Sequence, residues 1–486
     1  MGAVMLQGTG SDVGKSVLVA GICRAFANRG LKVLPFKPQN MSNNAAVTAD
    51  GGEIGRAQAL QAIACRVEPH TDMNPVLLKP QADRTSQLIV HGKVRGTLGA
   101  GNFREARGAL LGEVLESYAR LRAASDIVVI EGAGSPAEIN LRAGDIANMG
   151  FARAAEVPVV LVGDIDRGGV IAAIVGTRTV IDREDAAMIR GFIINKFRGD
   201  PALFTDGYAQ IEMLSNWRGF GVVPWLTATA RLPSEDAVIL ERRREDGAAA
   251  RVIACPILPR ISNFDDLDPL KLEPGVELRM IPPGQPIPAE AVLVVLAGSK
   301  ATIADLAALR AEGWDTDIRA HHRRGGAVLG LCGGYQMLGK RLSDPHGIEG
   351  PAGQVEGLAL LDVETVLTSK KALRHVTGTA LGARFDGYEM HMGETRGPDT
   401  ARPMAIFDDG RADGAISADG NVMGSYVHGL LSDPAQRTAL LARVGIRGSG
   451  RDYHASVDAA LDEIAAALEH HLDIDGLLAL SEAARD

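Results

Sequence analysis

Residues 2–16 read GAVMLQGTGSDVGKS, and this order predicts a phosphate-binding loop between a buried strand and a helix. The glycines, among them Gly10 and Gly14, let backbone N–H groups turn towards a phosphate, and the start of the helix adds its dipole. We expect Lys15 to reach the outer phosphates of a nucleotide and the Ser16 hydroxyl to bind Mg²⁺. A bare glycine-rich turn is the competing interpretation, and the Gly-Lys-Ser ending between a strand and a helix argues against it.

Outward from this loop, the first half of the chain alternates between apolar runs and longer helical patterns. The runs are short, rich in valine, isoleucine and leucine, and lack alternating polar residues, as expected for strands buried on both faces. They lie at residues 3–6, 33–36, 127–130, 157–162 and 191–194. Helical patterns such as 14–29 and 55–66 separate them. This alternation predicts an α/β fold with a parallel sheet between two layers of helices.

Two acidic residues stand where a Mg²⁺ ligand is expected. Glu131 ends the run 127–130, so its side chain should emerge at the carboxyl edge of the sheet, where open α/β sheets bind ligands. Asp50 lies in a loop before a helical pattern. Because Mg²⁺ prefers carboxylate and phosphate oxygens, we predict that Ser16, Asp50 and Glu131 contribute to its site. A capping or solvated acid is the alternative for both carboxylates, and the spacing does not decide the role of Asp50.

Two further polar residues at strand ends are candidates for nucleotide contacts. Lys37 ends the second predicted strand and is a candidate phosphate contact, although a surface lysine fits the same position. Asn195 follows the run 191–194, at a place where a polar side chain often reads a nucleotide base. Asp145 lies in a loop where it could touch a substrate or cap a helix, and the spacing does not distinguish these roles.

A second α/β pattern occupies the other half of the chain, with buried-strand runs at 252–254, 291–296 and 327–331. Between the halves, a proline, a charged run and three alanines predict a linker, with a surface loop inside one domain as the alternative. Near the C-terminus, apolar residues spaced by three and four predict an amphipathic helix that packs on the body. We therefore divide the chain into a phosphate-binding domain at 1–230, a linker at 231–250, a second domain at 251–445 and a helical tail at 446–486.

The second half contains a candidate nucleophile. The segment Ala327-Val-Leu-Gly-Leu-Cys332-Gly-Gly reads as a strand, a cysteine and two glycines before a helix. Such a turn presents the sulfur at the start of a helix, where the dipole favours the thiolate. Gly333 leaves room for a substrate, and its N–H can stabilise an oxyanion together with a donor from the turn through Gly298. A buried structural cysteine is the alternative.

A thiolate nucleophile needs a base, and the chain has 11 histidines to supply one. His428 follows a strand-like run and precedes a glycine. It comes after Cys332 by most of a small domain, and this order fits a catalytic pair. His391 is the weaker rival.

Composition argues against several classes of protein. The chain has 486 residues, of which 46% are apolar and 23% charged, as in a soluble globular protein of about two or three domains. Its 51 Lys and Arg against 60 Asp and Glu give a net charge of −9 without a basic block, which disfavours nucleic acids and anionic membranes as partners. No apolar run reaches the ~18 residues that span a bilayer, and the N-terminus lacks the basic flank of a signal peptide. The four scattered cysteines fit a reducing, cytoplasmic compartment.

Taken together, the two halves resemble the corrinoid amidase family. Gly-Leu-Cys332-Gly-Gly-Tyr-Gln and Tyr-Val-His428-Gly-Leu are similar to the class I glutamine amidotransferase domain, which has a flavodoxin-like α/β fold. The loop 8–16 with Glu131-Gly-Ala-Gly is similar to the dethiobiotin synthetase type of ATP-binding domain. Many class I amidotransferases carry His-x-Glu, in which the glutamate orients the histidine, whereas Leu430 occupies that position here, as in the corrinoid branch. The resemblance therefore does not say what orients His428.

Longer motifs are similar to one branch of that family, which amidates the b, d, e and g carboxylates of adenosylcobyrinic acid a,c-diamide in cobalamin biosynthesis. The motifs are Lys37-Pro-Gln-Asn-Met-Ser-Asn-Asn, residues 47–58 (VTADGGEIGRAQ) and Glu138-Ile-Asn-Leu-Arg. The resemblance implies that Cys332 hydrolyses glutamine, and that ATP and Mg²⁺ in the first domain convert a corrinoid carboxylate into an acyl phosphate. Ammonia then displaces phosphate. The implied substrates are a corrinoid, L-glutamine and ATP, with no tightly bound prosthetic group and no defined oligomeric state.

Two rival functions remain. The sister branch of the family amidates cobyrinic acid itself to the a,c-diamide, and only the segments around Asn40 and Asp50 argue against it. A switch of the partition-ATPase type, in which the nucleotide drives dimerisation, usually carries an extra lysine near the start of the loop. Here that place reads Gly8-Thr-Gly, and such a switch would leave Cys332 without a role.

Overall fold

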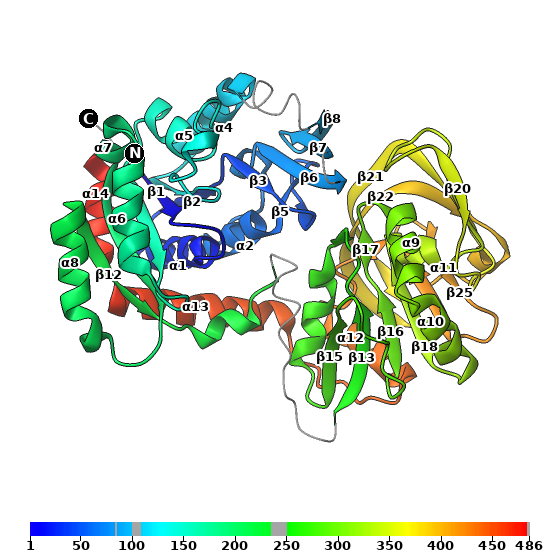
Figure 1. Cartoon of the computed structure of the whole chain (residues 1–486). Coiled ribbons are helices and arrows are strands. Elements are labelled where there is room, and N and C mark those ends of the chain that lie inside the picture. Colours follow the sequence, from blue (N-terminus) through cyan, green and yellow to red (C-terminus); the bar gives the residue numbers. More distant parts are fainter. Residues whose placement is uncertain (83–84, 100–107, 235–249, 484–486) are drawn as a thin grey trace.

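The computed structural model describes residues 1–82, 85–99, 108–234 and 250–483, and shows two α/β domains side by side (Figure 1). Each domain is built around a mainly parallel sheet, so the predicted fold class is confirmed. Of the predicted linker at 231–250, residues 235–249 lie outside the described residues. None of the described helices is both long enough and apolar enough to cross a bilayer.

The main sheet of the first domain has the order β12-β11-β10-β1-β9-β2, with all strands parallel. The apolar runs of the sequence correspond to every strand except β12, a partly exposed edge strand with two glycines and no continuous apolar run. The strands are β1 (Gly2–Gly8), β2 (Val33–Phe36), β9 (Ile127–Glu131), β10 (Val159–Asp164), β11 (Ile189–Phe197) and β12 (Arg218–Pro224).

Both faces of this sheet are buried under helices. Along β1, Ala3 and Met5 pack into one apolar cluster, and Val4 and Leu6 pack into another on the opposite face. This explains why the predicted strands lack alternating polar residues. The helices are α1 (Lys15–Asn28), α2 (Arg56–Ala64), α4 (Leu111–Ala124), α5 (Met149–Ala154), α6 (Val170–Val180), α7 (Arg183–Met188) and α8 (Thr205–Ser215).

Short strands extend the first domain towards the second (Figure 1). One small sheet has the order β3-β6-β7-β8, and β4 pairs with β5. These strands are β3 (Gln39–Met41), β4 (Ala45–Val47), β5 (Glu53–Gly55), β6 (Val76–Ala82), β7 (Thr85–Val90) and β8 (Lys93–Gly99).

The second domain combines a mainly parallel sheet, in which β25 alone pairs antiparallel, with a mostly antiparallel sheet. The first has the order β15-β13-β16-β18-β26-β25 and the second the order β20-β19-β21-β22-β27. The hairpin of β21 and β22 was not predicted, because its two strands alternate between buried and exposed positions only in part. The strands are β13 (Arg251–Pro256), β14 (Ile261–Ser262), β15 (Val276–Ile281), β16 (Leu293–Leu296), β17 (Gly298–Ser299), β18 (Ala327–Leu331), β19 (Arg341–Asp344), β20 (Gly353–Glu356), β21 (Glu364–Ala380), β22 (Ala383–Arg396), β23 (Ala405–Phe407), β24 (Ala412–Asp413), β25 (Ala415–Ile416), β26 (Val422–Ser425) and β27 (Val427–His428). The helices are η6 (Phe264–Leu272), α9 (Thr302–Ala311), α10 (Trp314–Arg323), α11 (Gly333–Leu338) and α12 (Pro434–Arg443).

A buried contact joins the two domains. Ala45, Leu77 and Ile89 of the first domain share a small apolar cluster with Met390 of β22. Beside this cluster, the buried carboxylate of Glu53 contacts a lysine from each domain, Lys79 at 2.6 Å and Lys371. The two domains are therefore in direct contact through both apolar and charged side chains.

The C-terminal helices return to the first domain. Helix α13 (Tyr453–His471) runs along α1, and α14 (Ile474–Glu482) follows it (Figure 1). Apolar residues of α13, among them Ile464 and Leu468, belong to the same buried cluster as α1. The contact is so close that a Cβ on Gly21 of α1 would lie 2.5 Å from Leu468 Cδ1. The predicted amphipathic helix thus covers one face of the phosphate-binding domain.

We expect Leu468→Ala to lower the free energy of unfolding of the first domain by about 2–5 kcal/mol, because it removes a fully buried side chain from a close contact. Urea unfolding followed by circular dichroism measures this loss. Leu203→Ala is a matched control, since Leu203 is 85% exposed and its truncation should change stability by less than about 0.5 kcal/mol. Equal effects of the two substitutions would mean that α13 is not part of this core.

Candidate active sites

The predicted phosphate-binding loop connects β1 to α1. Gly14 precedes the helix with φ 92°, a conformation that favours glycine, and a Cβ there would lie 2.4 Å from Asn195 Nδ2. Lys15 Nζ donates hydrogen bonds to the backbone oxygens of Gly10, at 3.1 Å, and of Gly134, at 3.3 Å. The lysine is thereby held over the loop, as binding of outer phosphates requires.

Ser16 and Glu131 meet at the carboxyl end of the sheet. Ser16 Oγ donates to Glu131 Oε1 at 2.8 Å, and Lys37 Nζ lies 2.8 Å from the same oxygen. Gln61 Nε2 of α2 donates to the other oxygen of Glu131 at 2.6 Å. Burial raises the pKa of Glu131, but the charge of Lys37 and these hydrogen bonds outweigh that effect and lower it. Glu131 is therefore an ionised carboxylate beside the phosphate-binding loop.

The structure does not bring Asp50 to this carboxylate, so the three predicted metal ligands do not lie together. Its two side-chain oxygens accept hydrogen bonds from Thr71, from the backbone N–H at 3.2 Å and from the hydroxyl at 2.5 Å. Asp50 is also not among the described residues that line the cavity around Ser16 and Glu131. Its carboxylate joins two loops of the first domain, and this role needs no metal. Asp145, whose role the sequence left open, accepts backbone hydrogen bonds at the start of α5.

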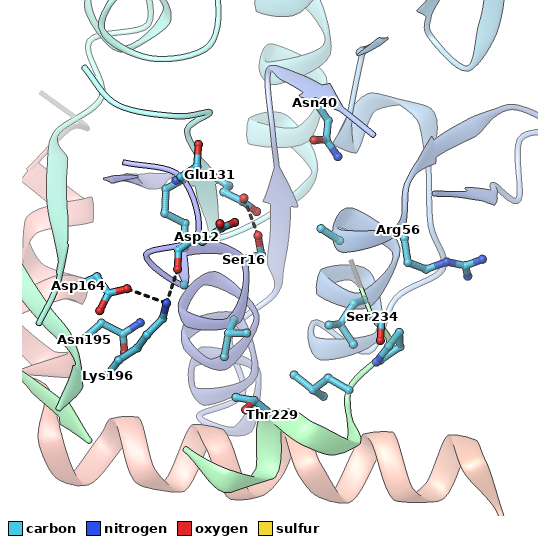
Figure 2. A pocket seen from close by; sticks show the side chains of 18 of the residues that line it. Asp12, Ser16, Asn40, Arg56, Glu131, Asp164, Asn195, Lys196, Thr229 and Ser234 are labelled. Carbon is cyan, nitrogen blue, oxygen red and sulfur yellow. Dashed lines mark hydrogen bonds and ion pairs between the residues drawn. The ribbon is translucent and has the colours of Figure 1, made fainter. Parts of the chain in front are cut away.

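Asn195 lies behind the loop, and two charged residues that sequence analysis did not select lie beside it (Figure 2). Asn195 Nδ2 donates to the backbone oxygen of Val13 at 2.8 Å. Lys196 Nζ contacts Asp164 Oδ2 at 2.8 Å and the backbone oxygen of Asp12. Asp164 ends β10 and Lys196 lies near the end of β11, its parallel neighbour, so the strand-end rule that selected Asn195 could also have selected them.

One large cavity contains these groups. Its volume is about 1620 Å³, and Ser16, Lys37, Arg56, Glu131 and Asn195 are among its lining residues. Strand β15 of the second domain forms part of the wall. Because pockets for drug-sized ligands measure ~300–1,000 Å³, this cavity has room for a nucleotide and a second substrate.

Cys332 occupies the predicted turn between β18 and α11. Its backbone has φ 51° and ψ −109°, which is unusual for a residue other than glycine and presents the side chain away from the strand. Of the four cysteines it is the one that is partly exposed, and the other three are buried. The alternative of a buried structural cysteine therefore does not hold.

The two glycines predicted to flank the nucleophile lie close together. A Cβ on Gly333 would lie 2.8 Å from the backbone nitrogen of Ser299, the residue after Gly298. A Cβ on Gly298 would lie 2.8 Å from the backbone oxygen of Ser262. A side chain at Gly333 would therefore push the two turns apart, and a side chain at Gly298 would clash with β14. Backbone N–H groups of both turns are thus positioned near Cys332, as an oxyanion site requires.

His428 is the imidazole next to Cys332, and Asp266 orients it. Asp266 Oδ2 lies 2.7 Å from His428 Nδ1, and Asp266 Oδ1 accepts a hydrogen bond from the Gly429 backbone at 2.7 Å. Burial lowers the pKa of His428, but the charge of Asp266 and the hydrogen bonds to Asp266 and Cys332 raise it to about 10. An imidazole held in this way favours the thiolate form of its neighbour.

The rival His391 has a different environment. Its ring stacks on Tyr426, with centroids 3.7 Å apart, and its Nε2 lies 3.7 Å from Glu389. Its Nδ1 is buried and makes no hydrogen bond with a described residue. Of the two candidates, His428 is the one that lies beside Cys332 and is held by a carboxylate at hydrogen-bond distance.

Asp266 was not predicted, because the acid of a His-x-Glu arrangement lies two residues after the histidine. That position, Leu430, is packed in the core of the second domain. Asp266 comes from η6, 162 residues earlier in the chain. The available signal was weak: Asp265, Asp266 and Asp268 form a short acidic group soon after a buried strand.

Comparisons with known proteins agree with this geometry. Residues 4–239 match the CobQ/CobB/MinD/ParA nucleotide binding domain, and residues 252–436 match the CobB/CobQ-like glutamine amidotransferase domain. Three relatives are described as cobyric acid synthases. The protein of Rhizorhabdus wittichii is 79% identical over 99% of this chain and 100% of its own length. That of Novosphingobium aromaticivorans is 78% identical over 99% and 98%, and that of Rhodobacter capsulatus is 62% identical over 99% and 100%.

The similarity covers both domains and both candidate sites, and relatives from different genera agree. With 79% identity over essentially the whole of both chains, this chain belongs to the cobyric acid synthase family, enzymes in which a nucleotide-binding domain is joined to a glutamine amidotransferase domain.

Proposed function

We propose that this enzyme uses ATP and glutamine to amidate the b, d, e and g carboxylates of adenosylcobyrinic acid a,c-diamide. The observation that carries the proposal is the pairing of two different centres across one interface. A thiol, an imidazole and a carboxylate form one centre, and a phosphate-binding loop with a buried carboxylate forms the other. The corrinoid substrate follows from the shared name of the relatives, which describes synthesis of cobyric acid.

Glutamine hydrolysis takes place in the second domain. The Cys332 thiolate attacks the amide carbon of glutamine, and backbone N–H groups of the turns at Gly298 and Gly333 stabilise the oxyanion. His428 donates a proton to the departing nitrogen, which leaves as ammonia and gives a thioester. His428 then removes a proton from water, which hydrolyses the thioester to glutamate. Asp266 holds the imidazole in the tautomer that both proton transfers need.

Carboxylate activation takes place in the cavity of the first domain. A corrinoid carboxylate attacks the γ-phosphorus of ATP to give an acyl phosphate and ADP, and ammonia then displaces phosphate to form the amide. Lys15 and Lys37 bind the phosphate oxygens, and Asn195, which lines the same cavity, contacts the base. The acyl phosphate is needed because a carboxylate is a poor electrophile. The shared interface is needed because free ammonia is mostly protonated near neutral pH.

The described residues fit a magnesium ion shared with the nucleotide. They contain no group of three His, Cys, Asp or Glu side chains that would hold a metal on their own. Mg²⁺ is usually bound by one or two carboxylates together with substrate phosphates. Ser16 and Glu131 offer a hydroxyl and a carboxylate at one place and would hold the ion. When bound, it neutralises charge on the phosphates during transfer.

Two variants test whether the centres are separate. Lys15→Ala should abolish ATP-dependent amidation and leave glutamate release from glutamine measurable. Cys332→Ala should abolish glutamate release, and ammonium at high pH should restore amidation because it replaces the missing ammonia. Glutamate release that survives in Cys332→Ala would contradict the proposed nucleophile.

Mass spectrometry should count four added amides on the a,c-diamide, whereas two amides on cobyrinic acid and none on the diamide would indicate the sister reaction.

We expect Glu131→Gln to raise the Mg²⁺ concentration needed for half-maximal ATP-dependent amidation by at least about tenfold, because it removes the charge of the proposed ligand. A magnesium titration of the amidation rate measures this shift. Asp50→Asn is the matched control and should leave the midpoint unchanged, since Asp50 contacts Thr71 instead. A shift in Asp50→Asn with none in Glu131→Gln would reverse our assignment.

We expect Asp266→Asn to lower kcat for glutamate release by ~10²–10⁴, because an amide at this place does not stabilise the imidazolium or select its tautomer. Alkylation of Cys332 by iodoacetamide at neutral pH should also become slower, since the pKa of His428 falls without Asp266. His391→Asn serves as the control and should retain glutamate release within threefold of wild type. The assignment fails when the control loses more activity than the Asp266 variant.

A further inference from the structure

Arg56, the first residue of α2, extends from the first domain into the second. Its Nη2 lies 2.9 Å from Asp265 Oδ2 and donates to the Tyr388 hydroxyl at 2.5 Å. The same nitrogen donates to the backbone oxygen of Ala45 at 3.1 Å. In Figure 2 the Arg56 side chain points away from Ser16 and Glu131. One side chain of the nucleotide-binding domain thus contacts two elements of the glutaminase domain, η6 and β22.

Both of these elements lead directly to His428. Asp265 precedes Asp266, whose carboxylate holds His428 Nδ1 at 2.7 Å. The Tyr388 ring stacks on the His428 ring, with centroids 5.2 Å apart and an angle of 19° between the planes. Tyr388 and His428 are also paired in the register of β22 and β27. Arg56 therefore contacts the neighbours of His428 from two sides.

A second contact across the interface fixes the start of η6. Asn263, which precedes η6 with φ 49°, donates from its backbone N–H to Asn44 Oδ1 at 2.7 Å. Its side-chain oxygen accepts from the Ala45 backbone at 3.2 Å, and its Nδ2 donates to the Tyr388 hydroxyl at 3.3 Å. The helical turn that carries Asp266 is therefore held by the first domain at two places. Asn44 and Ala45 bind Asn263, and Arg56 binds Asp265.

The contact of Arg56 with Asp265 is poorly suited to stability alone. Arg56 Nε and Asp265 Oδ1 are both buried and make no hydrogen bond with a described residue. Burial raises the pKa of Asp265 to about 7, although the charge of Arg56 lowers it. Buried ion pairs add little net stability, and unsatisfied buried polar atoms cost free energy. A buried pair of this kind is better explained by the geometry that it imposes on η6.

Arg56 also lines the cavity that contains the phosphate-binding loop, so it borders both centres. We propose that Arg56 is a positioning residue through which the nucleotide-binding domain aligns Asp266 and His428 for glutamine hydrolysis. The inference rests on the proposed glutaminase role of Cys332 and His428. An arginine suits this task because its rigid, planar group of N–H donors can serve several acceptors at once, and a lysine cannot reproduce that geometry.

The test compares full-length wild-type enzyme with Arg56→Met and Arg56→Lys. Arg56→Met should lower kcat for glutamate release at least tenfold and leave KM for glutamine within threefold, because the variant disturbs the base and not glutamine binding. Amidation supported by ammonium should fall at least tenfold less than amidation supported by glutamine. Arg56→Lys should give an intermediate kcat, since it keeps the charge beside Asp265 without the planar donors.

Alkylation of Cys332 by iodoacetamide gives a second measurement that needs no turnover. The other three cysteines are buried, so the modified thiol is readily identified by mass spectrometry. Arg56→Met should slow the alkylation about tenfold, because a displaced Asp266 no longer holds His428 in its protonated form. Arg66→Ala is the matched control: Arg66 follows α2, its side chain is 58% exposed, and its variant should react like wild type.

The outcomes separate this inference from the proposed function. A wild-type enzyme that neither releases glutamate from glutamine nor forms amides would refute the proposed function itself. With an active wild type, equal losses of glutamine-supported and ammonium-supported amidation in both Arg56 variants would overturn the inference. An unchanged alkylation rate of Cys332 in Arg56→Met would overturn it as well.

Discussion

The docking of the two domains depends on a buried cluster of charged side chains to which both domains contribute. The carboxylate of Glu53 is 1% exposed and contacts Lys79 from its own domain and Lys371 from the other. Burial raises the pKa of Glu53, but the two lysine charges lower it to about 2, so the carboxylate stays ionised at the interface. A charge removed from water is tolerated only with its partners in place. Separation of the domains would leave Lys371 without this partner and Glu53 with Lys79 alone, which favours the docked arrangement.

That arrangement matters because both centres lie at turns from a strand to a helix. Gly14 ends the loop after β1, and Cys332 follows β18, each with a positive φ. The turn exposes backbone N–H groups or a sulfur at the carboxyl end of a parallel sheet, where no neighbouring strand covers them. Each centre is local to its own domain. The coupling between them has to come from side chains that cross the interface, and Lys371 and Arg56 do so.

The sequence was informative where the chemistry is local and uninformative where it is not. The strands of the first sheet other than β12, the loop at Gly14 and the turn at Cys332 could be predicted, because each depends on a few consecutive residues. The placement of Asp50 away from Ser16 and Glu131 could not be predicted, since position before a helix says nothing about which loop its carboxylate will bind. Asp266 and the hairpin of β21 and β22 were missed for a related reason. Their roles depend on pairings between distant segments, which single-sequence patterns do not contain.

The carboxylate that orients His428 comes from a distant segment of the chain, η6, and not from the residues next to the histidine. In a His-x-Glu arrangement, the histidine and the glutamate lie on one short segment, so their side chains can form a hydrogen bond without help from another part of the chain. Here Leu430 fills that place and is buried in the core, so a carboxylate at that position would be costly. The acid comes instead from η6, whose start is hydrogen bonded to Asn44 and Ala45 of the first domain. The alignment of His428 therefore depends on a segment that the nucleotide-binding domain holds in place, and docking of the domains becomes part of building the glutaminase centre.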